Sequence, residues 1–495
     1  MSVELRFLGW DSPVTAKVSD FLLAGDPAPP QDPARDLVVV PTTQAGRRLR
    51  QALAVRGASM KTAVPQVRVV TPSFFLLHQD EDSPAAAVEV AAAWADVLLK
   101  ADLGLYGSLF PARVSSQDLL WALRTGEMIE GLRRTLADGG CRMADVCRDF
   151  GALLEEEERW RDLGQLETAY LDRLGRLGLQ DPCLQMLQRA ETPPPPNGAE
   201  RIVLAAVPDP TPLMVRHLER LAARARIIVL VHAPEALAGC FDQWGRPLPD
   251  AWRARHIDIP DPDANVLLCG SPRSQSRMVL ELLAREADRF GPADVALGVP
   301  DEEVIPFLTA DLGAAGLVSF NPAGKTAAGH PMAQLLRAFR DVYADRDYRS
   351  AGALMRNSEF LDHLLEKHRI VPGRVLEEMD RCQNEHLPQS LDDLVRASRL
   401  PASSGTGPFE FPALEKAVAI LTHHVRSYET GGADASLRSF LQAVYETRTL
   451  RSTRPQDSDF LAVAEAVDAA LHRLCGGPLA TLEMDRAATL EMVPC

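Results

Sequence analysis

The sequence predicts an α/β protein that has two parallel-sheet regions with large all-helical insertions. Two observations indicate this fold class. Apolar runs that are too short for helices alternate with amphipathic helical patterns in residues 1–83, 197–260 and 261–330. Residues 84–196 and 331–495, by contrast, have helical periodicity throughout. A chain of 495 residues exceeds one ordinary hydrophobic core, so we expect two to four domains.

The first α/β domain is expected to be split, with residues 1–83 and 197–260 on either side of the helical insertion at 84–196. Its expected strands are 5–10, 37–40, 201–207 and 226–231, and residues 67–77 are expected to form a further strand that enters a short helix. Apolar runs of this length suit parallel strands that are covered on both faces.

An expected strand passes through a polar turn into an arginine-rich helix within residues 37–53, LVVVPTTQAGRRLRQAL. Thr42 and Thr43 can cap the start of this helix. Its apolar residues Leu49 and Leu53 share one face. Three basic residues fall mostly on the other faces of the helix: Arg47, Arg48 and Arg50. Helix N-termini and arginines both favour phosphate oxygens, so this stretch is a candidate DNA-binding element.

The insertion at 84–196 is expected to contain three amphipathic helical segments. Ser115, three residues before Asp118, is a helix-start signal, and Gly139–Gly140 is a stop signal. The proline run at 193–196 is expected to close the insertion as a stiff linker.

A second α/β domain is expected to begin at 261–330, after a Pro/Asp-rich break. Its expected strands are 265–270, 294–299 and 317–320, and its expected helices are 276–290 and 302–312. A second set of candidate DNA-binding residues lies where its first strand passes into its first helix, and this set is Arg273, Gln275 and Arg277. The helical segment at 331–495 is expected to contain helices at 331–345, 351–367, 412–427, 435–447 and 458–474.

The charge balance of the chain is acidic overall and basic locally. The net charge of −15 argues against nonspecific nucleic-acid binding by the whole surface. Between Arg35 and Arg68, however, seven basic residues stand against the single acid Asp36. A solvated helix face on an ordinary α/β protein would have the same pattern, so both interpretations stay open.

The remaining composition indicates a protein of the reducing cytoplasm. The eight cysteines form no CxxC pair and no Cys/His cluster with metal-ligand spacing. The N-terminus lacks a basic region followed by an apolar core, and no apolar run has the length of a membrane span. We therefore expect a cytoplasmic protein without a membrane partner and without a metal ligand set.

Motifs for nucleotide and metal chemistry are incomplete. Gly324-Lys325-Thr326 follows a short expected strand, but a phosphate loop needs glycine where Ser319 stands, and Pro322 removes an N–H donor. No acid stands two residues before any lysine, so a PD-(D/E)XK nuclease motif is absent. His363 and His368 lie five apart in an expected helix, and this spacing puts them on different faces. No catalytic or nucleotide-binding residue is assigned.

Four stretches resemble the AddB/RexB-type subunit of bacterial helicase-nucleases and its relatives labelled PD-(D/E)XK nuclease family proteins, with a more distant similarity to RecC. They are 38–53, 160–182, 267–312 and 321–339, and the last two look like the start of the second motor domain of a superfamily 1 helicase. The resemblance implies two RecA-like domains, here degenerate, and a role in DNA repair and DNA recombination at double-strand ends. It also implies DNA and an AddA/UvrD-type motor subunit as partners.

The chain departs from this family pattern in two ways. Its phosphate loop and magnesium-binding acid are missing, so the motor-like folds are expected to be an inactive ATPase scaffold. It also ends at Cys495 before any nuclease signature, so it resembles the N-terminal half of such a protein. The exonuclease domain of the family, with its iron–sulfur cluster and Mg, would then lie outside this chain, and no cofactor is expected within it.

Two hypotheses for function follow. In the first, the chain binds DNA through Thr42, the Arg47/Arg48/Arg50 face and the 273–277 set, without catalysis. In the second, it is an active nucleotide-fold enzyme, such as a P-loop ATPase that uses Lys325 or a nucleotide-sugar transferase. The first predicts salt-sensitive DNA binding without turnover, and the second predicts nucleotide binding that Lys325→Ala abolishes.

Overall fold

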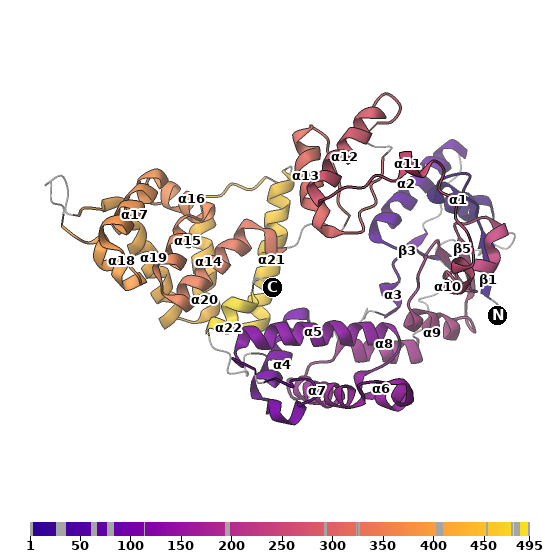
Figure 1. The fold of residues 1–495 in the computed structure, drawn as a ribbon, viewed down its shortest axis with the longest axis horizontal. Coiled ribbons are helices and arrows are strands. Elements are labelled where there is room, and N and C mark those ends of the chain that lie inside the picture. The colour runs from indigo at the N-terminus through magenta and orange to yellow at the C-terminus, as the bar shows by residue number, and fades with distance from the viewer. Residues whose placement is uncertain are drawn as a thin grey trace.

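The protein is mostly helical and contains one small parallel sheet, as the computed structural model shows (Figure 1). The structure describes residues 3–25, 36–60, 67–76, 84–112, 114–193, 199–291, 295–322, 324, 327–401, 409–451, 454–476, 479 and 486–493. Within these ranges, no helix combines the length and the apolar character that crossing a bilayer requires. The one parallel sheet with its surrounding helices confirms the predicted α/β character of the chain, for the first of the two expected parallel-sheet regions.

The sheet has five parallel strands in the order β1-β5-β4-β2-β3. The strands are β1 (Val3–Phe7), β2 (Asp36–Val39), β3 (Arg68–Val70), β4 (Arg201–Ala205) and β5 (Arg226–Val231). In the register of the central strands, Val38 of β2 pairs with Val203 of β4. Arg201 forms a buried ion pair with Asp36 across the same two strands, with Nε 2.6 Å from Oδ1. Strands from both sides of the helical insertion thus build one sheet.

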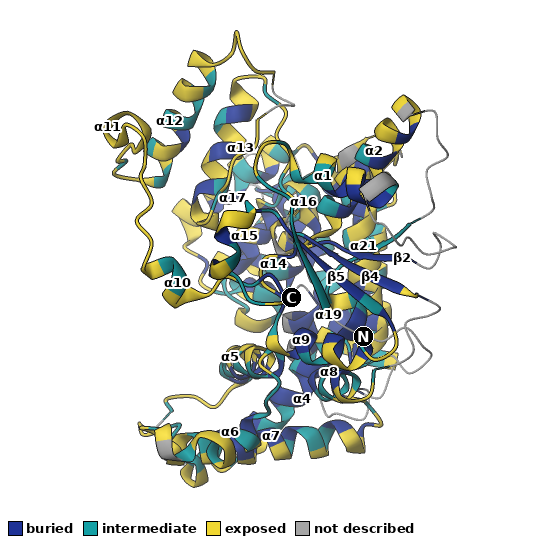
Figure 2. Ribbon diagram, turned by 90° about the vertical axis from the view of Figure 1, so that its right-hand side faces the viewer, coloured by how far each residue is buried: buried dark blue, intermediate teal, exposed yellow. Residues whose placement is uncertain are grey.

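Helices cover both faces of this sheet because successive side chains of a strand point to opposite faces. Val38 faces a layer that contains α1 (Val14–Asp20) and α2 (Thr43–Met60). Leu37 and Val39 face the other layer. That layer contains α3 (Ser73–Leu76), α8 (Pro182–Glu191) and α9 (Pro212–Leu221). The central strands are consequently buried, which explains their uninterrupted apolar sequences (Figure 2).

The helical insertion has its own core. Its helices are α4 (Ala87–Lys100), α5 (Leu119–Asp138), α6 (Met143–Phe150) and α7 (Glu157–Arg176), and α8 closes it. The rings of Trp94 and Tyr170 stack in this core with centroids 4.2 Å apart. Asp118 caps α5 by accepting a hydrogen bond from Trp121 N at 2.9 Å, and Gly139 ends the helix as expected. Asp118, rather than the expected Ser115, is therefore the helix-start residue.

One buried arginine connects three helices of the insertion. Arg133 on α5 is almost fully buried and donates both Nη groups to Asp181 at the start of α8, at 2.7 and 2.9 Å. Its Nε donates to Glu167 on α7 at 2.8 Å, and Nη1 also contacts Glu130 at 3.2 Å. Such a buried charge network is tolerated only when every member is paired. Removing the arginine would leave three carboxylates without their common partner.

The second α/β region differs from the sequence prediction. The two predicted helices are present, as α12 (Pro272–Arg285) and α13 (Ile305–Ala314). The described residues of 265–270, 295–299 and 317–320, however, form no strand ladder, so the predicted strands are not present there. Parallel strands need cover on both faces, whereas Leu268 and Val318 are almost fully exposed, at 97% and 95%.

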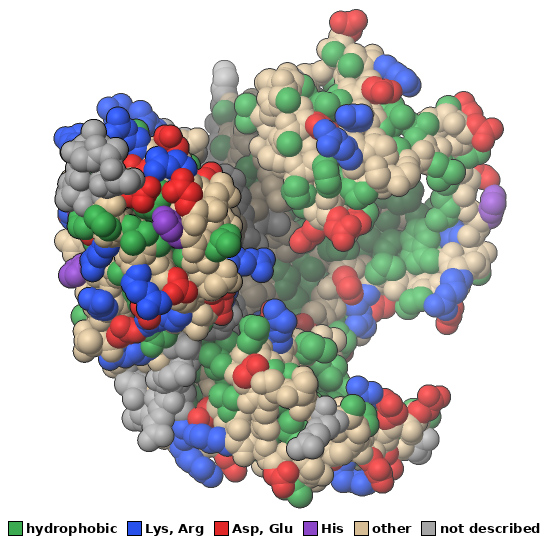
Figure 3. All heavy atoms as spheres, turned by 60° about the vertical axis from the view of Figure 1, so that its left-hand side comes forward, with side chains coloured by type: hydrophobic (Ala, Val, Ile, Leu, Met, Phe, Trp, Pro, Cys, Tyr) green, Lys and Arg blue, Asp and Glu red, His purple; other side chains and the backbone are tan. Residues whose placement is uncertain are grey.

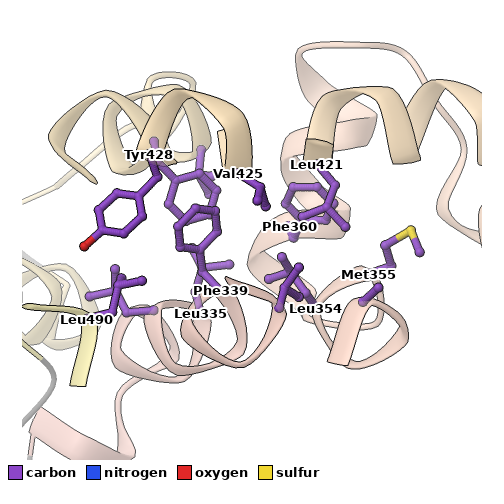
Figure 4. Close-up of a cluster of buried hydrophobic side chains, with 14 of the residues drawn as sticks. Leu335, Phe339, Leu354, Met355, Phe360, Leu421, Val425, Tyr428 and Leu490 are labelled. Carbon is purple, nitrogen blue, oxygen red and sulfur yellow. The ribbon is translucent and has the colours of Figure 1, made fainter. Parts of the chain in front are cut away.

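The C-terminal region is a helical unit with the largest buried cluster of the molecule (Figure 4). Its helices are α14 (Pro331–Asp345), α15 (Tyr348–Met355), α16 (Ser358–Glu366), α17 (Pro372–His386), α18 (Leu391–Ser398), α19 (Pro412–Thr430), α20 (Ala433–Tyr445), α21 (Pro455–Gly476) and α22 (Arg486–Met492). The helix predicted at 351–367 is interrupted, because α15 ends at Met355 and Asn357 caps α16 by accepting from Glu359 N at 3.0 Å. Phe339 and Phe440 stack at 4.5 Å between α14 and α20. Arg473 of α21 contacts Glu89 of α4 at 3.1 Å and joins this unit to the insertion.

Three histidines with lowered pKa values lead us to expect that the folded state loses stability in mild acid. Burial lowers the pKa of His217, His363 and His424 to about 4, from an ordinary value of 6.5. The unfolded chain therefore takes up protons first as the pH falls, and the unfolding free energy should decrease from about pH 6.5 down to pH 4. At 1.36 kcal/mol per pKa unit, the loss reaches roughly 3 kcal/mol for each of the fully buried pair His217 and His363. Urea denaturation between pH 7.5 and 4 measures it.

The control for this prediction is the double variant His217→Leu/His363→Leu. Its unfolding free energy should depend less on pH than that of the wild-type chain over the same interval. Equal pH dependence in the two proteins would show that these histidines are not held neutral in the folded state.

Candidate nucleic-acid interface

The start of α2 is fixed by a side-chain cap. β2 ends at Val39, and Thr42 Oγ1 accepts a hydrogen bond from Ala45 N at 3.1 Å, while Thr42 O accepts one from Gly46 N at 3.1 Å. Thr42 therefore caps the helix as the sequence predicted. Because β2 belongs to a parallel sheet, the amino end of α2 lies at the carboxyl edge of the strands.

α2 packs closely on the sheet through a glycine and two leucines. A Cβ atom at Gly46 would lie only 3.2 Å from Val69 Cγ1 and 3.4 Å from Val40 Cγ2. Leu49 and Leu53 are buried against the same surface. With this face turned inward, the arginines at 47, 48 and 50 lie on the exposed part of the helix.

The arginines of α2 differ in their partners. Arg47 and Arg48 are exposed, and neither has a hydrogen bond or ion pair to any residue that the structure describes. Arg50 donates from Nη2 to Val69 O on the edge strand β3 at 3.0 Å. Arg56 pairs with Asp20 of α1, with Nε 2.7 Å from Oδ1. The basic face available to an anion therefore consists of Arg47, Arg48 and the remaining N–H groups of Arg50, and we call it the α2 arginine face.

This face lies beside the point where the sheet topology reverses. From β2 the chain proceeds outward to β3, whereas from the neighbouring β4 it proceeds in the other direction to β5. In open parallel sheets, ligands bind outside the carboxyl ends of the strands at such a switch point. Ala206, directly after β4, has a left-handed backbone with φ 51°, which is uncommon for a residue other than glycine. Asp209 follows in the same loop and is exposed.

Two hydroxyl side chains at the same edge were not selected from the sequence. Thr71 and Ser73 follow β3, the strand that Arg50 contacts, and their hydroxyl oxygens lie 2.9 Å apart. Hydroxyl groups at such an edge are common phosphate donors. The signal was Thr-Pro-Ser at 71–73, which places a proline and hydroxyl side chains directly after a short strand, as Pro-Thr-Thr does at 41–43.

The second predicted set lies elsewhere. Arg273, Gln275 and Arg277 are exposed in the first two turns of α12, which Ser271 caps by accepting a hydrogen bond from Ser274 N at 3.2 Å. Figure 2 shows α12 and α2 on opposite sides of the molecule. The structure therefore does not bring the two sets together on one surface.

The turn after β1 is occupied by groups that disfavour phosphate. Gly9 has φ 76°, and Trp10 Nε1 donates to His232 O at 2.6 Å. Asp11 forms an ion pair with Lys17 of α1 at 2.7 Å, and this ammonium group holds the pKa of the Asp11 carboxyl below its usual value. A carboxylate in front of α1 repels phosphate. Lys325, which the alternative nucleotide-enzyme hypothesis would use, lies outside the described residues.

Comparison with known proteins gives no assignment: no protein-family model matches the chain, and no curated protein does either. The chemistry of the candidate interface is therefore inferred from its residues. Figure 3 shows basic and acidic side chains interspersed over the face that it draws. Two arginines that have no acidic partner among the described residues, next to a capped helix end, make the α2 arginine face the candidate site for an anionic backbone.

Proposed function

We propose that this chain is a non-motor DNA-binding subunit of a bacterial helicase-nuclease that processes double-strand ends for recombinational repair. The α2 arginine face would bind the DNA backbone. The observation that carries the proposal is the exposure of Arg47 and Arg48 without partners in the described part of the chain, beside the switch point of a parallel sheet. Arginine binds phosphate through planar, paired N–H donors, and positions a protein on DNA without reading its sequence.

The resemblance of residues 38–53 and 267–312 to AddB/RexB-type subunits supports the helicase-nuclease part of the proposal. In this proposal both motor-like regions, each with a RecA-like ancestry, act as scaffold. An AddA/UvrD-type partner supplies ATP hydrolysis, and the nuclease chemistry lies outside these residues.

The β1–α1 turn supports a scaffold rather than an ATPase. A phosphate loop needs small residues whose backbone N–H groups surround the phosphates. Here the turn carries the Trp10 ring and the Asp11 carboxylate, which is fixed by Lys17. Phosphate binding by the backbone is therefore disfavoured at the position where a motor domain would hold ATP.

The proposal is tested by measuring DNA binding and ATP hydrolysis in the same samples. The full chain is titrated into a labelled duplex with a single-stranded tail, anisotropy reports binding, and phosphate release reports turnover. We expect binding that weakens as salt increases, because displaced counterions contribute to affinity, and no hydrolysis. ATP turnover that Lys325→Ala abolishes, without DNA binding, would instead support the nucleotide-enzyme hypothesis.

A further inference from the structure

Four histidines meet in the C-terminal helical unit. His363 lies on α16, His368 lies in the turn after it, and His423 and His424 lie on α19. The ring centroid of His363 is 4.9 Å from that of His368 and 6.2 Å from that of His424. The rings of His423 and His424 are 5.5 Å apart.

The sequence prediction that His363 and His368 would not meet is wrong, because the helix ends between them. α16 stops at Glu366, and Arg369 adopts a left-handed backbone with φ 56°. Ile370 N then donates to Leu364 O at 2.9 Å, which folds the chain back over the last turn of the helix. This reversal, rather than helical periodicity, places the two imidazoles next to each other.

His363 is buried without a satisfactory partner. Only 2% of the residue is exposed, and neither ring nitrogen has a hydrogen bond of good geometry to the residues described. The backbone of Ala443 is close enough to favour the charged ring but does not complete such a bond. Buried polar side chains are nearly always satisfied, so an unsatisfied imidazole among other imidazoles points to a ligand. His368 is exposed and opens the cluster to solvent.

The spacing of the rings suits a transition-metal ion. With Zn–N bonds of about 2.0–2.1 Å and tetrahedral angles, the centroids of two coordinating imidazoles lie roughly 5 Å apart. The separations of 4.9 and 6.2 Å around His363 bracket this value. The nitrogens of the three rings do not all lie within 4.8 Å of one another in the structure, so binding a common ion requires the rings to turn about χ2. Neutral imidazole is the form that coordinates a metal.

The surroundings of the cluster are apolar on one side and charge-balanced on the other. The ring centroid of Phe360 lies 6.1 Å from that of His363, and the ring centroid of Phe440 lies 5.1 Å from that of His424. Lys367, whose positive charge disfavours a second cation, is neutralised by Glu446 at 2.8 Å. An apolar shell with a solvent-exposed ligand is a common environment for a bound metal.

We propose that His363, His368 and His424 form a binding site for zinc or a similar divalent transition ion. Three imidazole ligands suit zinc, copper or nickel rather than magnesium or calcium. Among the described residues, the group whose possible ligand atoms already lie within 4.8 Å of one another is a different one, Glu385, His386 and Glu410. It is mainly exposed and contains no buried unsatisfied side chain among the residues described, so it serves as the competing site.

Cobalt titration of the full chain tests the proposal, because tetrahedral cobalt absorbs visible light much more strongly than the hydrated ion. We expect saturation at one equivalent, reversal by zinc, and at least tenfold weaker binding in His368→Gln, which changes an exposed turn residue and leaves the core intact. His424→Gln should have the same effect. The matched control is His423→Gln, the neighbour on α19 outside the ligand set, which should bind like the wild type.

Two outcomes would overturn the proposal. In the first, no tetrahedral cobalt spectrum forms although circular dichroism shows the chain folded. In the second, binding survives His368→Gln and His424→Gln but is lost in His386→Gln, which would move the ion to the competing site. Neither outcome depends on DNA binding, so failure here is distinct from failure of the proposed function.

Discussion

Replacing Arg133 by alanine is expected to destabilise the helical insertion by about 3–5 kcal/mol, the usual cost of removing one partner from a buried ion network. The guanidinium joins α5 to Asp181 and Glu167 on two other helices, with N–O distances of 2.7–2.9 Å. Without it, carboxylates that are almost inaccessible to water keep their charge with no common counterion. Asp181 also caps α8 by accepting from Leu184 N at 2.8 Å, so the loss should reach the sheet domain.

Urea denaturation followed by circular dichroism measures this effect, and the neighbouring residue provides the control. Arg134 contacts the same Glu130 at 3.2 Å, but its side chain is 58% exposed. Arg134→Ala should therefore cost less than about 1 kcal/mol. Equal effects of the two substitutions would show that Arg133 is solvated and that the network does not hold the insertion together.

The double variant Arg47→Gln/Arg48→Gln is expected to bind a tailed DNA duplex at least about tenfold more weakly near 0.1 M salt. Each lost charged hydrogen bond to phosphate is worth roughly 1 kcal/mol or more, and 1.4 kcal/mol is a factor of ten in affinity. Both residues are exposed and have no described partner, so the fold should be unaffected. Fluorescence anisotropy measures the dissociation constant.

A matched control removes the same charge elsewhere. Arg159 and Arg161 on α7 are half-exposed and pair with Glu156 and Glu157 in the helical insertion. Arg159→Gln/Arg161→Gln changes the net charge by the same amount, and its affinity for DNA should remain within about twofold of the wild type, since screened distant charges contribute little. Parallel losses in both variants would indicate a general charge effect instead of a local interface.

The parallel sheet and the cap of α2 were predictable because their signals are local. Val38 lies in an uninterrupted apolar run, as expected for a strand buried on both faces, and Thr42 stands directly before a helical pattern. The alternation of Leu37 and Val38 between two helical layers follows from strand geometry alone. Residues with such local constraints are those for which the prediction and the structure agree.

The features that could not be predicted depend on contacts between distant segments. The segment at 317–320 has the composition of a strand, but strand formation needs a neighbour, and Val318 remains exposed in the structure. The hydrogen bond from Arg50 to Val69 depends on how closely Gly46 packs against β3. Arg369 gives no sequence signal for a left-handed turn, so the contact between His363 and His368, which both precede it, was missed.

The most direct test of the α2 arginine face is the salt dependence of DNA affinity. The logarithm of the binding constant is measured against the logarithm of salt concentration for the wild type, Arg47→Gln/Arg48→Gln and the Arg159/Arg161 control. Each phosphate contact contributes a slope of about 0.9 on duplex DNA, so the α2 variant should have a slope smaller by roughly 1.8, while the control matches the wild type. Identical slopes in all three proteins would contradict binding of DNA through α2.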